Sequence, residues 1–250
     1  MSEQKIAFIT GANRGIGFET AKKLGKLGIF PVIGSRNEEA GKAAVEKLKA
    51  EGIESDFIKF DVSSKEDYAS AYKYFESKFG KLDILVNNAG IGLEGEPANA
   101  IGKENATSGV SEEILRKTFD ANFFGVVLST QVLLPLIKKS DAGRIVNVSS
   151  NLGSLTMHSD PSAPLYAIKM FAYDSSKTAL NAFTVHLAHE LKDTVIKVNS
   201  LHPGWIHTEL GGSAAPMTPE DGALTSVRLA TLLPDGPTGG YFHLEETIAW

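Results

Sequence analysis

The 250-residue chain contains no cysteine. This absence excludes disulfides, thiolate catalysis and zinc sites with cysteine ligands. The sequence also has no basic stripe, since its net charge is -5 and charges of both signs are scattered along it. A protein that tracks a phosphate backbone needs clustered positive charge, so nucleic acid is not an expected partner.

Long apolar runs are missing as well. Residues 1–5 lead into the first apolar segment without the hydrophobic region of a signal peptide. The most apolar stretch, 123–137, is interrupted by Ser129, Thr130 and Gln131 and is shorter than the ~20 residues that cross a bilayer. We therefore expect no membrane partner and a cytoplasmic location.

The sequence does contain an alternation of short apolar runs with amphipathic segments of helical length, and 42% of its residues are hydrophobic. Because no linker or repeat divides it, residues 1–250 are expected to form a single domain. The alternation predicts an α/β protein with a parallel sheet of about seven strands and helices on both faces, a doubly wound Rossmann fold. The strands are expected at 5–10, 30–34, 56–60, 82–87, 144–149, 196–201 and 241–244.

Two helix starts can be identified from their caps. Ser63 with Glu66 three residues later is typical of a capping box, and the helix that follows is expected to end near Gly80. Ser111, followed by two glutamates, is expected to cap a long helix that reaches Lys139.

The first strand ends in the glycine-rich turn TGANRGIG, residues 10–17. Glycines permit a tight turn and close approach of backbone N–H groups, and the helix N-terminus behind them favours an anion such as pyrophosphate. The spacing is not G-x-G-x-x-G, but strand, turn and helix occur in the order that a dinucleotide site needs. A purely structural turn is the alternative. The residues expected to bind the cofactor here are Gly11, Asn13, Arg14, Gly15, Ile16 and Gly17.

The residue after the second strand indicates which dinucleotide binds. An acidic residue there would accept hydrogen bonds from the free 2′-hydroxyl of NADH, whereas this chain has Arg36. An arginine can pair with a 2′-phosphate, and Arg14 can supply a second cation. NADPH or NADP is therefore expected rather than NADH, unless both arginines are merely solvated.

A tyrosine and a lysine four positions apart, Tyr173 and Lys177, would lie on one face of a helix. A nearby ammonium favours the phenolate and brings a tyrosine closer to a working acid–base group. The spacing alone proves little, because Tyr74 and Lys78 have it too.

Further short segments follow the later strands in order: DV at 61–62, NNAG at 87–90, SS at 149–150 and PGWIHT at 203–208. Together with the glycine turn and the Tyr173 pair, this ordered set resembles the short-chain dehydrogenase/reductase family over nearly the whole chain. The run GPTGGYF at 236–242 and Trp250 resemble its NADPH-dependent carbonyl reductase branch most.

The resemblance implies the positions of further cofactor contacts. It places Asp61 and Val62 beside the adenine, and Asn88, Ala89 and Gly90 on the ribose side. It also selects Tyr173 over Tyr74, because Tyr173 follows the SS segment. The last segment of the set is expected near the nicotinamide and the phosphates, through Pro203, Gly204, Ile206 and Thr208.

The resemblance also implies a reaction, the transfer of hydride from NADPH to a ketone or aldehyde, reversible as secondary alcohol oxidation. Tyr173 is expected to donate the proton, Lys177 to hold the nicotinamide ribose, and Ser150 to polarise the substrate oxygen. Ser149 is the alternative serine, and Tyr166 a less suitable acid. Asn122 matches the asparagine that helps to hold a water behind the lysine; it would otherwise be an ordinary buried asparagine. A non-catalytic NADP-binding sensor and a dehydratase or epimerase relative are the competing functions.

The substrate is expected to be hydrophobic. Trp205, Phe171, Met157 and Phe242 predict an apolar pocket. The stretch between Ser150 and the tyrosine is longer than in many family members, so loops at about 151–172 and 209–219 are expected to contact substrate. No metal is expected, because His186 and His189 lack an evident third ligand. The sequence is consistent with a homo-oligomer and with a monomer.

Overall fold

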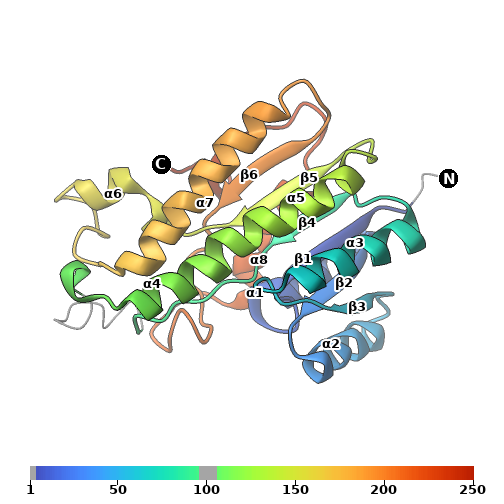
Figure 1. Ribbon diagram of the computed structural model, residues 1–250, viewed down its shortest axis with the longest axis horizontal. Helices are drawn as coiled ribbons and strands as arrows, with labels where there is room; N and C mark the ends of the chain where they lie inside the picture. Colours follow the sequence, from blue (N-terminus) through green and yellow to red (C-terminus); the bar gives the residue numbers. More distant parts are fainter. Residues whose placement is uncertain (1–3, 96–105) are drawn as a thin grey trace.

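A computed structural model describes residues 4–95 and 106–250. Its centre is an eight-stranded sheet with the order β3-β2-β1-β4-β5-β6-β7-β8 (Figure 1). The first seven strands pair in parallel, and β8 pairs antiparallel with β7. The strands are β1 (Ile6–Thr10), β2 (Phe30–Ser35), β3 (Asp56–Lys59), β4 (Ile84–Asn87), β5 (Arg144–Val148), β6 (Lys197–Leu201), β7 (Tyr241–His243) and β8 (Glu246–Thr247).

Helices cover both faces of this sheet (Figure 1). Helices α3 (Lys65–Phe79), α5 (Gly125–Ile137) and α7 (Phe171–Glu190) contribute to one apolar core. Helices α1 (Gly15–Lys26), α2 (Glu38–Ala50) and α8 (Pro219–Ala230) contribute to the other. Along β1, Ile6 and Phe8 belong to the first core and Ala7 and Ile9 to the second, so a central strand is buried on both sides. The doubly wound Rossmann fold is confirmed.

The order of the strands reverses between β1 and β4, which are neighbours in the sheet although two strands separate them in sequence. Ligands of doubly wound sheets bind at such a switch point, beyond the carboxyl ends of the strands. Those ends carry the glycine turn after β1 and the NNAG segment after β4.

The capping box at Ser63 is wrong by one residue. The N-cap of α3 is Ser64, whose hydroxyl accepts a hydrogen bond from the backbone N–H of Asp67 at 3.2 Å. Two adjacent serines with acidic residues three positions after each give the same pattern, and only the backbone geometry distinguishes them. The helix ends at Gly80, as expected, with a left-handed φ of 72°.

The long helix after Ser111 is confirmed, although its middle is not a regular α-helix. Ser111 caps α4 (Glu112–Phe119) by accepting from the N–H of Ile114, and a π-helical segment, Asp120–Phe124, joins α4 to α5. The helix formed by Glu112–Ile137 is long and apolar enough to span a membrane, but half of its most apolar window is buried inside the protein. That burial is typical of a core helix.

Candidate active site

The glycine turn after β1 has the backbone shape that its sequence predicts. Gly11 and Gly15 have φ values of 64° and 58°, which side chains other than glycine rarely adopt. Gly17 is restricted by space, because a Cβ there would lie 2.8 Å from the carbonyl oxygen of Gly11. A side chain at Gly11 or Gly15 would strain the backbone, and one at Gly17 would collide with the turn.

The start of α1, just behind this turn, suits an anion. Its N-cap, Arg14, makes no capping hydrogen bond through its side chain, and the first turn holds no acidic residue. The first N–H groups of a helix need acceptors and carry partial positive charge. A pyrophosphate fits this chemistry, and Asn13 and Ile16 lie half-buried in the same turn.

Thr10 and Asn88 join the glycine turn to the segment after β4. The Thr10 hydroxyl accepts from the N–H groups of Asn88 and Ala89, both at 3.0 Å. The Asn88 amide donates to the carbonyls of Thr10 at 2.9 Å and of Gly11 at 3.1 Å. The structure thus brings two of the predicted cofactor segments together through the side chain of Asn88.

The two arginines expected at a 2′-phosphate have different surroundings. Arg36, directly after β2, is exposed to solvent. Arg14 forms an ion pair with Glu209, and both side chains are more than two-thirds exposed. Glu209 would compete with a 2′-phosphate for Arg14. This ion pair could not be predicted, because a contact between distant loop positions leaves no local sequence pattern.

The remaining predicted cofactor residues also follow strand ends. After β3, Asp61 accepts from the N–H of Ser63 at 2.8 Å, and the carbonyl of Val62 accepts from the Tyr68 hydroxyl. After β6, Thr208 lies beside the glycine turn, since a Cβ on Gly15 would be 3.7 Å from its methyl group. Ile206 is buried, Pro203 is half-buried, and Gly204 has a φ of 101°.

Tyr173 and Lys177 are buried on the sheet-facing side of α7, with exposed fractions of 6% and 4%. The Lys177 ammonium lies 5.6 Å from the centre of the Tyr173 ring and donates to the Val148 carbonyl at 2.9 Å. The Ser150 hydroxyl lies close enough to the phenol to lower the pKa of Tyr173. Ser149 instead donates to the backbone carbonyl of Lys177 at 3.5 Å. Of the two serines, Ser150 is the one that affects the pKa of the phenol.

Burial determines the protonation of this pair. It raises the pKa of Tyr173 to about 12, although the nearby Ser150 hydroxyl acts in the opposite direction. Burial also lowers the pKa of Lys177 to about 8. The expected stabilisation of the phenolate by Lys177 is not seen, because burial, Ser150 and Asp174 are the causes of the pKa shift of Tyr173. Near neutral pH the tyrosine keeps the proton that a carbonyl reduction requires.

Asn122 lies in the π-helical segment and is fully buried. Its amide oxygen accepts from the N–H of Ile91 at 2.8 Å, and its nitrogen donates to the carbonyl of Ile91 at 2.8 Å and to the Ser176 hydroxyl at 3.0 Å. A Cβ on Gly90 would lie 3.2 Å from the Asn122 oxygen and 3.4 Å from the Lys177 nitrogen. The asparagine therefore links the segment after β4 to α7 beside the lysine.

The second pair with this spacing, Tyr74 and Lys78, lies elsewhere. Both side chains bind the carboxylate of Asp56, and the Tyr74 hydroxyl donates to it at 2.6 Å. Asp56 is the first residue of β3, so this pair lies at the amino end of the strands, opposite the predicted cofactor segments. The pair has a structural partner of its own.

The apolar residues around Tyr173 are not the ones that the sequence suggested. Phe242 packs into the core of the sheet, and Phe171 and Trp205 are about 40% exposed. No pattern in the sequence identifies the aliphatic residues that lie there, because their contacts depend on the paths of two loops. Tyr173 packs instead in a cluster with Leu152, Leu165, Ile168, Met170 and Leu210.

Two loops supply most of this cluster. Leu165 and Ile168 come from residues 154–170, which we call the flap and which contains α6 (Leu155–Ser159). Leu210 comes from the loop before α8, and this loop ends at Thr218, the N-cap of that helix. Both loops expected to contact substrate thus cover the phenol.

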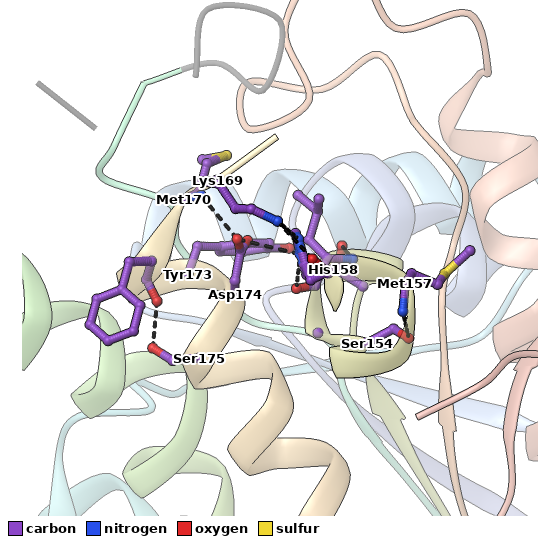
Figure 2. Close-up of polar contacts among 12 residues, drawn as sticks. Ser154, Met157, His158, Lys169, Met170, Tyr173, Asp174 and Ser175 are labelled. Carbon is purple, nitrogen blue, oxygen red and sulfur yellow. Dashed lines mark hydrogen bonds and ion pairs between the residues drawn. The ribbon is translucent and has the colours of Figure 1, made fainter. Parts of the chain in front are cut away.

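A polar cluster joins the flap to α7 (Figure 2). The Lys169 ammonium lies 3.0 Å from His158 Nδ1 and donates to the His158 carbonyl at 3.1 Å. His158 Nε2 lies 3.5 Å from Asp174, whose carboxylate accepts from the N–H of Met170 at 2.9 Å. Burial and the nearby Glu94 raise the pKa of Asp174 to about 7. A cavity of about 480 Å³ lies beside this cluster, on the face of α7 that turns away from Tyr173.

Sequence reasoning missed one buried residue next to the candidate catalytic groups, Glu94. Glu94 accepts from the N–H groups of Ala172 at 3.1 Å and of Tyr173 at 2.9 Å. His202 Nδ1 accepts from the N–H of Asn151, the residue after Ser150, at 3.2 Å, and burial lowers the pKa of His202 to about 3. Glu94 lies in no recognisable motif, whereas the half-buried His202 directly precedes the PGWIHT segment.

The predicted histidine pair on α7 gathers no metal-ligating cluster. Across residues 4–95 and 106–250, no three His, Asp or Glu side chains lie close enough to hold a metal ion. His186 lines a second cavity, of about 300 Å³, together with Trp250.

Comparisons with known proteins agree with this arrangement. The chain matches the short chain dehydrogenase family over residues 5–218. It is 35% identical to (+)-neomenthol dehydrogenase of Arabidopsis thaliana, with 97% of each chain covered, and 30% identical to carbonyl reductase 1 (NADPH) of Mus musculus, with 100% of this chain and 99% of the relative covered. The solved structure of salutaridine reductase from Papaver somniferum is 31% identical and superposes with a TM-score of 0.81, covering 96% of this chain and 99% of that one. The chain belongs to the short-chain dehydrogenase family.

Proposed function

We propose that this chain is an NADPH-dependent reductase of hydrophobic ketones or aldehydes, which also oxidises secondary alcohols in the reverse direction. The observation that carries the proposal is a protonated, buried Tyr173 next to Ser150 and Lys177, under an aliphatic cover. The name of the mouse relative includes both the carbonyl activity and NADPH. Aliphatic surroundings favour an apolar substrate over a charged metabolite.

The cofactor fits the residues at the switch point. The positive-φ glycines of the turn and the N-terminus of α1 would hold its pyrophosphate, and Arg36 its 2′-phosphate. Asp61 and Val62 would lie at the adenine, the NNAG segment at the ribose, and residues 203–208 near the nicotinamide. When bound, NADPH supplies the hydride.

The side chains then have distinct roles. Ser150 donates a hydrogen bond to the substrate oxygen and orients it towards the tyrosine. Tyr173 transfers its phenolic proton to that oxygen as negative charge develops. Lys177 holds the nicotinamide ribose, and Asn122 fixes the segment beside it through Ile91. The aliphatic cluster excludes water from the reacting oxygen.

The test is an assay with NADPH and a panel of aryl ketones and aldehydes, followed by the loss of reduced-nicotinamide absorbance. Tyr173→Phe is expected to bind NADPH normally and to lose about a hundredfold to ten-thousandfold of the turnover, the usual contribution of a general acid. Tyr74→Phe is the matched control and should retain the wild-type kcat. Cofactor binding without turnover of any carbonyl would instead support the non-catalytic sensor. Cytoplasmic location and oligomeric state stay predictions.

A further inference from the structure

The first turn of α7 is held by a carboxylate from another part of the chain. The first N–H groups of a helix have no partner within the helix, and the N-cap here, Met170, supplies no side-chain acceptor. Glu94 fills that role: one of its oxygens accepts from the N–H of Ala172 and the other from the N–H of Tyr173. The second of these donors is the backbone of the proposed acid itself.

This contact is buried and charge-assisted. Glu94 is 7% exposed, and a carboxylate at a helix N-terminus is favoured by the positive end of the helix dipole. A charged hydrogen bond contributes more than a neutral one, and its loss leaves buried donors unsatisfied. The carboxylate therefore constrains the backbone of Tyr173 more strongly than an ordinary cap would.

Glu94 also connects α7 to the predicted ribose side of the cofactor site. It belongs to the segment after β4 that contains Asn88 and Gly90, and Asn122 holds this segment at Ile91 through two hydrogen bonds of 2.8 Å. Because the segment is hydrogen-bonded at both Ile91 and Glu94, it holds the ribose-binding backbone and the first turn of α7 in a fixed relative position. The distance from the Tyr173 hydroxyl to a substrate oxygen at the cofactor depends on how these two parts are positioned relative to each other.

We propose that Glu94 is a positioning residue, which holds the first turn of α7 so that Tyr173 stays aligned with a carbonyl at the cofactor site. It acts through the backbone of Tyr173 and contacts no reacting atom. The role rests on the proposed reductase function.

The kinetic test compares Glu94→Ala, Glu94→Gln and Ser111→Ala. Ser111 caps α4 through the N–H of Ile114, so its replacement removes a helix cap away from the tyrosine. We expect Glu94→Ala to lower kcat by about tenfold to a hundredfold, since small misplacements of reacting groups cost that much. Its KM for NADPH should stay within about twofold of the wild-type value. Glu94→Gln, which keeps one acceptor oxygen, should have an intermediate kcat, and Ser111→Ala the wild-type kcat.

A second measurement does not depend on activity. In the wild type, the amides of Ala172 and Tyr173 should exchange slowly with deuterium in NMR spectra, and in Glu94→Gln or Glu94→Ala they should exchange faster, while Ser111→Ala leaves them unchanged. Unchanged exchange in both Glu94 variants would overturn the proposal whatever the kinetics. A wild-type kcat in Glu94→Ala would overturn it as well. A wild-type enzyme inactive on every carbonyl would refute the reductase function, and the positioning role with it, even if the exchange data showed that Glu94 holds these amides.

Discussion

Lys177 is a cation held in a buried position by a backbone carbonyl. Its nitrogen donates to Val148 at 2.9 Å, and burial lowers its pKa to about 8. Loss of its proton removes the positive charge and one of three N–H donors, and so weakens the binding of the ribose hydroxyls. Tyr173, with a pKa of about 12, stays protonated over the same range.

We therefore expect kcat/KM for NADPH to be level below pH 7 and to fall above about pH 8, approaching tenfold per pH unit, because this parameter reports groups of the free enzyme. The profile between pH 6 and 10 measures this. Lys78→Ala, in which the lysine of the other tyrosine pair is replaced, should keep the same profile. A rate that rises through pH 8 would contradict the assignment.

Arg36 is expected to distinguish the two dinucleotides. Arg36→Ala should raise the KM for NADPH by about tenfold to a hundredfold, the range of a lost charged hydrogen bond, and leave the KM for NADH nearly unchanged. Arg116→Ala, which replaces an exposed arginine paired with Glu112 on α4, is the control and should alter neither value. Equal losses with both cofactors would show that Arg36 does not read the 2′-phosphate.

Single residues show how far sequence patterns reach. The spacing of Tyr173 and Lys177 occurs twice, and only its place in an ordered series of strand ends distinguished the two copies. Ser150 could be preferred over Ser149 only through the family resemblance, and its effect on the pKa of Tyr173 supports that preference. Glu94 could not be predicted, because its contacts with α7 join segments that are distant in sequence.

At the scale of elements, both strand positions and helix positions followed from periodicity and caps, and the errors are local. The predicted cap of α3 was wrong by one residue, because Ser63 and Ser64 both have an acidic residue three positions later. The π-helical turn at 120–124 has no sequence signature, although it places Asn122 against Ile91. Strand β8 has only two exposed residues, too few for a hydrophobic pattern.

Asp174, in the first turn of α7, should make the free energy of unfolding depend on pH. Asp174 is buried against His158, Lys169 and Glu94, and its pKa rises from 3.8 to about 7 in the folded chain. Between these values the folded state binds more protons than the unfolded state, so the free energy of unfolding falls as pH rises from about 4 to 7.

Asp174→Asn, which can still accept from the N–H of Met170, should remove most of this slope. We expect the variant to gain stability relative to the wild type at pH 8, by on the order of a few kcal/mol at most, and to gain little at pH 4. Urea unfolding at both pH values measures the difference. Parallel pH dependences in the two proteins would show that Asp174 ionises freely in the fold.

For the whole molecule, the fold could be predicted because every central strand carries apolar residues on both faces and the crossover helices follow in order. The shape of the substrate site could not be predicted, since the flap and the loop before α8 are placed by contacts such as those of Leu165 and Leu210 with the cluster that contains Tyr173. Those contacts depend on the three-dimensional path of the loops and not on a repeated pattern.

The proposed cofactor would contact segments on both sides of the switch point, from the turn after β1 to the loop after β6. Binding to the folded chain alone stabilises it, by about 2.7 kcal/mol at a hundred times Kd. For a chain of this size that corresponds to a rise in Tm of roughly 5–10 °C. We expect NADP⁺ to raise Tm more than NAD⁺ at equal concentration, and Arg36→Ala to reduce the difference while Arg116→Ala preserves it. Equal shifts with the two nucleotides, measured by calorimetry, would mean that the 2′-phosphate adds nothing to binding and that the exposed Arg36 and the Glu209-paired Arg14 remain solvated in the complex.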